Sequence, residues 1–328
     1  MKQTNISIFI PHIGCPHKCS FCDQRTISGT QKPPRAEDVT ALLDEQAPHL
    51  SERGITAEIA FFGGSFTAIP RDYMLELLKA AKSAVERHSC YTGIRCSTRP
   101  DCIDEQTLAL LKEYGMTAIE LGAQSMSDEV LAANERGHTA DDVRKAARLI
   151  KESGIELGLQ MMTGLYKDTP ERCLYTADEF IGLSPATVRV YPTVILKNTR
   201  LGELFERGEY KSFSFEETID LCAELLRKFT RNNIRVIRMG LHASADVERD
   251  MLGGVYHPAL RETVESRIIL NDLKERFSAL EKGNYRVYTD PKNISKVKGQ
   301  KKCNVKALSE LGYNIDVLPL DGEYLLIK

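Results

Sequence analysis

The chain has 328 residues, of which 42% are hydrophobic and 27% charged, and its 44 Lys and Arg against 46 Asp and Glu give a formal net charge of −2. This composition is typical of a soluble globular protein and excludes a collagen-like, coiled-coil or disordered chain. No apolar run approaches the roughly 20 residues that cross a bilayer, and Pro11 interrupts the first one, so we predict neither a membrane partner nor a signal peptide. Nine cysteines without an export signal indicate a reducing compartment, and we predict a cytoplasmic protein.

Short β-rich runs alternate with helical patterns along the first 240 residues. The predicted strands are 6–10, 58–62, 93–97, 117–121, 156–161 and 187–190. Six strand–helix units in series predict an α/β protein with a parallel sheet, closed into a full or partial (β/α) barrel, with six units as the expected form. An open doubly wound sheet is the alternative, because its local pattern is identical. Residues 234–239 form a further strand that continues or flanks the sheet.

The strand–helix rhythm stops after Gly240. Residues 259–280 predict a long, charged, amphipathic helix. Residues 284–328 have the pattern strand, helix, helix, strand, strand. We therefore expect a barrel over 1–240, a helical linker over 241–283 and a small basic α+β module over 284–328.

The strongest motif follows the first predicted strand. Cys15, Cys19 and Cys22 have the spacing C-x3-C-x2-C, which places three thiols at the carboxyl end of that strand, where (β/α) barrels carry their active sites. A structural zinc site usually has four protein ligands, and only His12 or His17 is close enough in sequence to be the fourth. Three thiolates on a four-iron cluster instead leave one iron without a protein ligand, free to chelate a small molecule through amino and carboxylate groups.

The cysteine spacing, with Phe21 before the last cysteine, resembles the radical S-adenosylmethionine (SAM) superfamily. The resemblance implies a [4Fe–4S] cluster on Cys15, Cys19 and Cys22, with SAM bound to the open iron. It also implies reductive cleavage of SAM to a 5′-deoxyadenosyl radical that takes a hydrogen atom from the substrate. A reducing electron donor of the flavodoxin or ferredoxin type would then be a partner.

Four further blocks of sequence lie at predicted strand ends, where a barrel enzyme needs polar groups. They are FFGGSFT (61–67), CSTRPD (96–101), ELGAQS with NERGH (120–125 and 134–138) and GLQMMTGL (158–165). The glycine pair in the first block would let the backbone approach a ligand closely. Each polar residue alone is also explained as a partner of loop backbone, whereas their joint placement favours one shared site.

In order and spacing these blocks resemble the oxygen-independent coproporphyrinogen oxidase branch and, more closely, the radical domain of the Elongator catalytic subunit family, over about residues 5–240. The resemblance implies that SAM is bound by Phe21, Gly63, Gly64, Ser65, Ser97, Gln124, Arg136 and Gln160. Arg136 would approach the carboxylate, and Ser97 or Gln160 the ribose or amino end. Ser65 stands where the superfamily often has a glutamate that binds the amino group.

Two departures narrow the implied function. The Elongator enzymes have a longer cysteine spacing and a C-terminal acetyltransferase domain, for which the residues after 240 are too few, so we expect no acetylated product. The coproporphyrinogen branch extends its cysteine loop with a C-x-C-like segment, which Asp23-Gln24-Arg25 lacks, and this weakens a role in haem synthesis.

We expect catalytic substrate contacts from Tyr191, after the sixth strand, and from His242, His257 and Arg261, beyond the last one. Histidine exchanges protons near neutral pH and arginine binds anions. The alternative for the segment around His257 is an ordinary helix start with Pro258 at its first position.

The C-terminal part is strongly basic, since residues 271–306 hold ten Lys and Arg against four Asp and Glu. Within it, GQKK (299–302) loosely resembles the G-x-x-G loop with which KH domains clamp nucleotide backbones, although Lys302 replaces the second glycine. A basic patch attracts phosphates, but a charge run is more often only a solvated face. Three hypotheses remain: a radical SAM enzyme acting on a transfer RNA (tRNA) nucleoside, one acting on a porphyrin or other small molecule, and a non-catalytic zinc- and RNA-binding protein.

Overall fold

A computed structural model describes residues 2–10, 13, 15, 19–23, 26–27, 32–322 and 325–327. Its main feature is a seven-stranded sheet with the order β1-β2-β3-β4-β5-β6-β8, in which every neighbouring pair is parallel. The strands are β1 (Lys2–Ile10), β2 (Ile55–Gly63), β3 (Tyr91–Thr98), β4 (Met116–Gln124), β5 (Glu156–Thr163), β6 (Thr187–Pro192) and β8 (Arg235–Met239). Because the order follows the chain without reversal, the partial barrel is confirmed and the doubly wound alternative is wrong.

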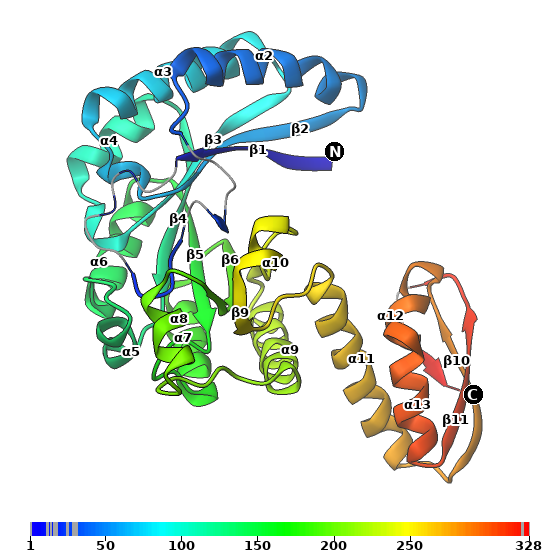
Figure 1. Cartoon of the computed structure of the whole chain (residues 1–328). Coiled ribbons are helices and arrows are strands. Elements are labelled where there is room, and N and C mark those ends of the chain that lie inside the picture. The colour runs from blue at the N-terminus through cyan, green and yellow to red at the C-terminus, as the bar shows by residue number, and fades with distance from the viewer. Residues whose placement is uncertain are drawn as a thin grey trace.

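The sheet curls into an open half-barrel, with β1 and β8 as its two edges in the described part of the chain (Figure 1). It has seven strands rather than the expected six, because β8 continues it. Helices cover the outer face; they are α2 (Ala36–Glu52), α3 (Arg71–Arg87), α4 (Glu105–Glu113), α5 (Asp128–Ala133), α6 (Ala140–Glu152), α7 (Pro170–Leu183) and α9 (Phe215–Arg231).

Amphipathic spacing explains how these helices pack. In α3 the side chains of Met74, Leu77, Leu78 and Ala81 lie on one face and are buried. Several helices begin at a polar side chain that accepts a hydrogen bond from the third residue of the helix, as Thr139 does for α6 and Ser214 for α9. Helices that follow a parallel strand begin near the carboxyl end of the sheet, so these starts gather around the mouth of the barrel.

Short elements surround that mouth. The 3-10 helices η1 (Phe66–Ala68) and η2 (Pro100–Cys102) follow β2 and β3. An antiparallel pair, β7 (Val194–Leu196) and β9 (Met251–Gly254), lies beside the sheet, and the short helices of this region are α8 (Arg200–Glu206) and α10 (Ala245–Asp250). Val247 of α10 packs on Val194 and Leu196, so α10 is held against β7.

The C-terminal part forms a second, smaller α+β unit with its own core. After α11 (Leu260–Ser278) come β10 (Gly283–Thr289), η3 (Pro291–Asn293), α12 (Ile294–Lys298), η4 (Gln300–Lys302), α13 (Cys303–Glu310), β11 (Tyr313–Pro319) and β12 (Leu326–Ile327). Its sheet has the order β11-β10-β12, and its core includes Phe277, Val287 and Leu308. Ion pairs from Arg267 of α11 to Glu216 and Asp220 join the unit to α9. Among the described helices, none has the length and apolar character needed to cross a membrane.

Candidate functional site

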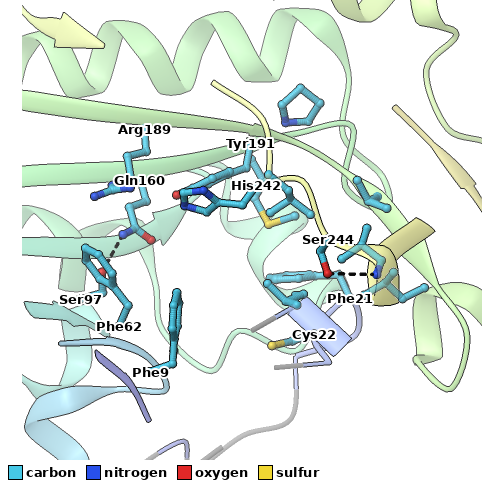
Figure 2. Close-up of a pocket in the computed structure, with 18 of the residues that line it drawn as sticks. Phe9, Phe21, Cys22, Phe62, Ser97, Gln160, Arg189, Tyr191, His242 and Ser244 are labelled. Carbon is cyan, nitrogen blue, oxygen red and sulfur yellow. Dashed lines mark hydrogen bonds between the residues drawn. The ribbon is translucent and has the colours of Figure 1, made fainter. Parts of the chain in front are cut away.

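Two adjoining cavities open at the carboxyl ends of the strands. The larger, of about 420 Å³, is called here the aromatic cavity and is shown in Figure 2. The smaller, of about 130 Å³, is called the cysteine cavity. The two cavities share six of their lining residues: Phe21, Cys22, Gly63, Ser97, Gln124 and Gln160. The two cavities therefore form one continuous region at the barrel mouth.

All three predicted cysteines meet at the cysteine cavity. Cys15, Cys19 and Cys22 line it, and no other Cys, His, Asp or Glu of the described residues does. The Cys22 amide donates to the Cys19 carbonyl oxygen at 3.1 Å, which brings these two residues into one turn. Ser20 anchors the loop, because its hydroxyl donates to the side-chain oxygen of the buried Asn134 at 2.8 Å.

The arrangement suits an iron–sulfur cluster better than a single zinc ion. Among the described residues, no three His, Cys, Asp or Glu side chains converge closely enough to hold one metal ion. Thiolates on different irons of a cluster lie farther apart than ligands of one ion, so three thiols around one cavity are compatible with a cluster. The zinc alternative needed His12 or His17, and both lie outside the described residues.

Arg136 and Gln124 carry buried polar atoms that are not satisfied by the protein. Arg136 donates through Nη1 to Cys19 Sγ at 3.0 Å and through Nη2 to the Gly122 carbonyl oxygen at 2.5 Å, while its Nε has no partner among the described residues. Gln124 Oε1 is likewise buried and has no partner in that part of the chain, and the Gln124 backbone adopts a φ of 67°. A buried polar atom without a partner costs roughly 1–3 kcal/mol. A polar ligand in the cysteine cavity would remove this cost, so these residues fit SAM.

The glycine pair is explained by the chain itself rather than by a ligand. A Cβ on Gly63, whose φ is 108°, would lie 2.7 Å from the Ile10 carbonyl oxygen, and one on Gly64 would lie 2.4 Å from that of Ile13. The Gly64 amide also donates to the Ile10 oxygen at 2.8 Å. Both glycines line the cysteine cavity, and the atoms that exclude a side chain belong to Ile10, at the end of β1, and to Ile13, so packing within the chain already requires glycine at both positions.

Ser65 and Ser97 already have partners inside the protein. The buried Ser65 hydroxyl pairs with Thr98 Oγ1 at 2.8 Å and accepts from the Arg99 amide at 3.2 Å, so it joins the ends of β2 and β3. Gln160 Nε2 donates to Ser97 Oγ and to Glu120 Oε2, both at 2.9 Å. Because both amide hydrogens are used, Gln160 has only its carbonyl oxygen left for a ligand.

A buried charge network beneath the cavities was missed at the level of sequence. Glu58, Arg95, Glu120 and Arg189 come from β2, β3, β4 and β6, and each is at most 8% exposed. Arg95 donates to Glu58 at 2.8 Å and to Glu120 at 2.9 Å, and Arg189 donates to Glu120 at 2.8 Å. The signal was present, since strands of a covered parallel sheet are normally apolar, and here β2, β3, β4 and β6 each contain a charged residue within an apolar run.

The aromatic cavity combines flat apolar walls with a few polar groups. Its aromatic lining residues are Phe9, Phe21, Phe62 and Tyr191, and its polar ones include Gln160, Arg189, His242 and Ser244 (Figure 2). The Arg189 guanidinium lies 4.9 Å from the centroid of the Phe62 ring. Such a lining suits a planar ligand with a polar edge.

Burial keeps two titratable side chains of this cavity, Tyr191 and His242, neutral. It raises the pKa of Tyr191, although Arg189 acts in the opposite direction, so the phenol is protonated at neutral pH. Burial, with the nearby Arg238 and Arg189, lowers the pKa of His242, whose imidazole is therefore neutral at pH 7. Both side chains can donate or accept hydrogen bonds without carrying a charge.

Of the four residues expected to contact substrate, two reach the aromatic cavity and two do not. Tyr191 and His242 line it, whereas His257 and Arg261 are absent from its lining. His257 Nδ1 accepts from the Ala259 amide at 3.1 Å, and Arg261 pairs with Glu265 at 2.8 Å. These local contacts at the start of α11 hold both side chains outside the cavity.

Tyr256 is a further residue of the site that was not among the four expected to contact substrate. The Ser244 amide donates to its hydroxyl at 2.6 Å, and the hydroxyl donates to the His242 carbonyl oxygen at 3.0 Å. Tyr256 therefore fixes the loop that carries two lining residues of the aromatic cavity. Nothing local in the sequence distinguishes it from other tyrosines, because its partners lie 12 and 14 residues away.

Comparison with known proteins agrees with this geometry. The model of the Radical SAM superfamily matches residues 9–180, and that of the Radical_SAM C-terminal domain matches residues 185–269. Elongator complex protein 3 of Bos taurus is 31% identical over 244 residues, 68% of this chain and 44% of that protein. A tRNA uridine(34) acetyltransferase of Methanocaldococcus infernus is 27% identical over 251 residues, 64% of this chain and 46% of that protein.

Among solved structures, the archaeal Methanocaldococcus infernus Elp3 has a TM-score of 0.66 at 21% identity, over 85% of this chain and 64% of that one, which shows a shared fold. The chain thus spans less than half the length of the two named sequence relatives. The superfamily model covers more than half of the chain. The chain therefore belongs to the radical SAM superfamily and is an enzyme that uses SAM and a [4Fe–4S] cluster.

Proposed function

We propose that Cys15, Cys19 and Cys22 bind the cluster, that SAM occupies the cysteine cavity, and that a nucleoside of tRNA enters the aromatic cavity as substrate. The observation that carries this proposal is the composition of one small cavity. It is lined by three thiols, and beside them Gln124 and Arg136 each have one buried polar atom for which the described residues supply no partner.

When bound, the cluster and SAM together supply a 5′-deoxyadenosyl radical that removes a hydrogen atom from the substrate. The residues of this chain bind and orient the reactants. Arg136 donates to Cys19 Sγ and thereby orients this cysteine, and its Nε, which has no partner among the described residues, is available for the SAM carboxylate. Gln124 Oε1 is available as an acceptor for the SAM amino group, and the Gln160 oxygen for the ribose.

The aromatic walls have a second role, which is to exclude water from a reactive intermediate. Phe9 and Phe62 face each other with ring centroids 6.4 Å apart, and Phe21 joins the two cavities. The buried charge network stays neutral as a whole and holds Arg189 and Gln160 at fixed positions below the substrate.

Two observations support a tRNA nucleoside as the substrate. Relatives that share the barrel include proteins named for action on tRNA uridine. A cavity of about 420 Å³ with aromatic walls also suits a single base turned out of its strand. Acetyl transfer is not part of the proposal. A reducing electron carrier of the flavodoxin or ferredoxin type is proposed as the partner, and the cytoplasmic location stays a prediction.

The test is anaerobic reconstitution of the full chain with iron and sulfide. We expect about four iron atoms per chain and, with dithionite and SAM, release of 5′-deoxyadenosine. Cys15→Ala, Cys19→Ala and Cys22→Ala should each lose iron and activity, whereas Cys303→Ala, at an exposed cysteine of the C-terminal unit, should keep both. One zinc and no iron in the wild-type protein would contradict the proposal.

The substrate is tested separately with tRNA that carries deuterium on its carbon atoms. Unfractionated tRNA should accelerate 5′-deoxyadenosine release, and the deuterium atom that it loses should appear in 5′-deoxyadenosine as an increase in mass. If tRNA has no effect and a porphyrinogen or another small molecule does, the RNA part of the proposal is wrong while the radical chemistry stands.

A further inference from the structure

A third cavity, of about 700 Å³, lies away from the cluster site, between α9, α11 and the turn that joins α12 to α13. We call it the basic groove. Its charged lining residues are Lys296, Lys298, Lys301, Lys302 and Arg267 against Glu216 and Glu262, a net formal charge of +3. This excess stands out in a chain whose overall charge is −2.

Three of these lysines have no carboxylate partner. Lys296 pairs with Glu265, and Arg267 pairs with Glu216 and Asp220. Lys298, Lys301 and Lys302, in contrast, form no ion pair with any residue in the part of the chain that the structure describes. Their positive charge is therefore available to a partner.

The turn that carries these lysines is anchored rather than loose. Lys301 and Lys302 adopt φ values of 51° and 61°. The neighbouring Asn304 is 2% exposed, and its Nδ2 donates to Ser266 Oγ at 2.9 Å and to the Lys296 carbonyl oxygen at 3.1 Å. These bonds tie the turn to α11, so the lysines are presented from a defined backbone and less order is lost on binding.

An aromatic ring stands on the opposite wall. Phe215, the first residue of α9, is 41% exposed and lines the groove. Its ring centroid lies 6.3 Å from that of His257, in an edge-on arrangement. Positive charge that follows a backbone, combined with an exposed ring on which a base can stack, is the usual composition of a surface that binds single-stranded nucleic acid.

The groove is connected to the mouth of the barrel. The start of α11 lies next to the end of β8 in space. A Cβ on Gly240, directly after β8, would lie 2.8 Å from the side chain of Leu260, the first residue of α11. Two consecutive residues span the distance between the sites: Tyr256 bonds to the loop of the aromatic cavity, and His257 contacts Phe215 in the groove. A chain-like substrate lying in the groove could thus send one nucleotide into the aromatic cavity.

We propose that the basic groove binds the phosphate backbone of the RNA substrate through Lys298, Lys301 and Lys302, with Phe215 as a stacking platform. This inference rests on the proposed function, since it takes RNA as the substrate. An acidic electron-transfer protein would also be attracted by the lysines, but it would not need an exposed ring within the groove, and so the observations favour RNA.

The test measures binding of unfractionated tRNA to the reconstituted full chain at about 50 and about 200 mM salt. The triple variant Lys298→Gln, Lys301→Gln, Lys302→Gln should bind at least roughly tenfold more weakly at the lower salt. Its slope of log affinity against log salt should fall by roughly 2 to 3, the value for three lost phosphate contacts. Phe215→Ala should weaken binding roughly tenfold and leave the salt slope unchanged.

The matched control replaces three exposed lysines elsewhere, as Lys79→Gln, Lys145→Gln, Lys274→Gln, and should bind tRNA like the wild type. Release of 5′-deoxyadenosine without RNA, driven by dithionite, should be the same in all variants and shows that they are folded. If the groove variant binds tRNA with unchanged affinity and slope, the groove proposal is overturned and the proposed function stands.

Two other results would overturn it in different ways. If the wild-type protein cleaves SAM but binds no tRNA at either salt concentration, both the groove proposal and the proposal of an RNA substrate are wrong. A groove variant that binds tRNA normally but is reduced more slowly by flavodoxin would assign the groove to the electron donor instead.

Discussion

The barrel interior and the basic groove both carry several charges, but they arrange them in opposite ways. In the interior, Glu120 alone is bonded to Arg95, Gln160 and Arg189, and acids balance bases. In the groove, Lys298, Lys301 and Lys302 have no acidic partner within the described residues. An unpaired charge is costly in a buried place and nearly free in water, so each arrangement is stable where it occurs.

The cysteine cavity lies between these two extremes. Like the interior it is buried, yet like the groove it contains polar atoms, on Gln124 and Arg136, that have no partner in the part of the chain that the structure describes. A buried polar atom without a hydrogen-bond partner lowers the stability of the fold. Such atoms are expected where a bound ligand supplies the missing partner. The comparison therefore separates residues that hold the fold from residues that await a ligand.

The largest effect should come from breaking the interior network. Glu120→Ala leaves Arg95 and Arg189 without their shared carboxylate, and we expect the free energy of unfolding to fall by about 3–5 kcal/mol. Glu179→Ala, which breaks a partly exposed pair with Arg144, should cost less than about 1 kcal/mol. Urea unfolding of the cluster-free chain measures both; similar losses would show that burial does not distinguish the two pairs.

His138 should produce a pH-dependent effect of the next size. Its side chain is 5% exposed, and burial, followed by the nearby Arg136, lowers its pKa to about 4. The folded protein thus binds this proton less readily than the unfolded chain, where histidine titrates near 6.5. Stability is complete above that pH and is lost as the pH falls through this window, by about 3 kcal/mol in total.

The measurement for His138 is the unfolding free energy of the wild type and of His138→Gln across that pH range. The difference between the two proteins should shrink towards pH 4, because the variant lacks the titrating group. A constant difference would mean that His138 does not keep its low pKa in solution.

A smaller effect is expected at the cysteine cavity. Arg136→Met removes the donor with the free Nε, and we expect SAM to bind about 30-fold more weakly, equivalent to about 2 kcal/mol for a hydrogen bond to a charged group. Arg136→Lys should recover part of this affinity. Calorimetry on the reconstituted protein measures it, with Arg172→Met, at a partly exposed arginine outside the cavity lining, as the control. Unchanged affinity in Arg136→Met would place SAM elsewhere.

The smallest effect concerns the groove. Replacing Lys298, Lys301 and Lys302 by Gln should change the free energy of unfolding by less than about 0.5 kcal/mol, because these side chains form no ion pair with any described residue. Thermal unfolding measures this change. A loss of several kcal/mol would mean that the lysines support the fold, and the contrast with the interior network would disappear.

Local patterns predicted much of this architecture. Every expected strand coincides with an observed one, because alternation of apolar runs and helical periodicity is a property of neighbouring residues. The cysteine loop was recognised for the same reason, since its spacing lies within eight residues. The strand-end blocks around Gln124 and Gln160 followed once parallel strands were assumed, because such strands all end at one edge.

Partners that are far apart in sequence could not be predicted. Arg189 and Glu120 are separated by 69 residues, and only the register of β4, β5 and β6 brings them together. His257 and Arg261 were expected at the substrate site, but contacts with Ala259 and Glu265 at the start of α11 hold them outside it. The local sequence pattern predicts where a helix begins, but it does not predict whether the side chains at that start point into the cavity or away from it.

By itself, the sequence determined where the strands and helices lie along the chain, that the sheet is parallel and that three thiols gather at its mouth, because periodicity and short spacing act over a few residues. Only the tertiary structure decided which charges are paired, which polar atoms remain free and why Gly63 and Gly64 must lack side chains beside Ile10. Those properties depend on strand register and on the packing of distant segments, and these are set by the fold as a whole.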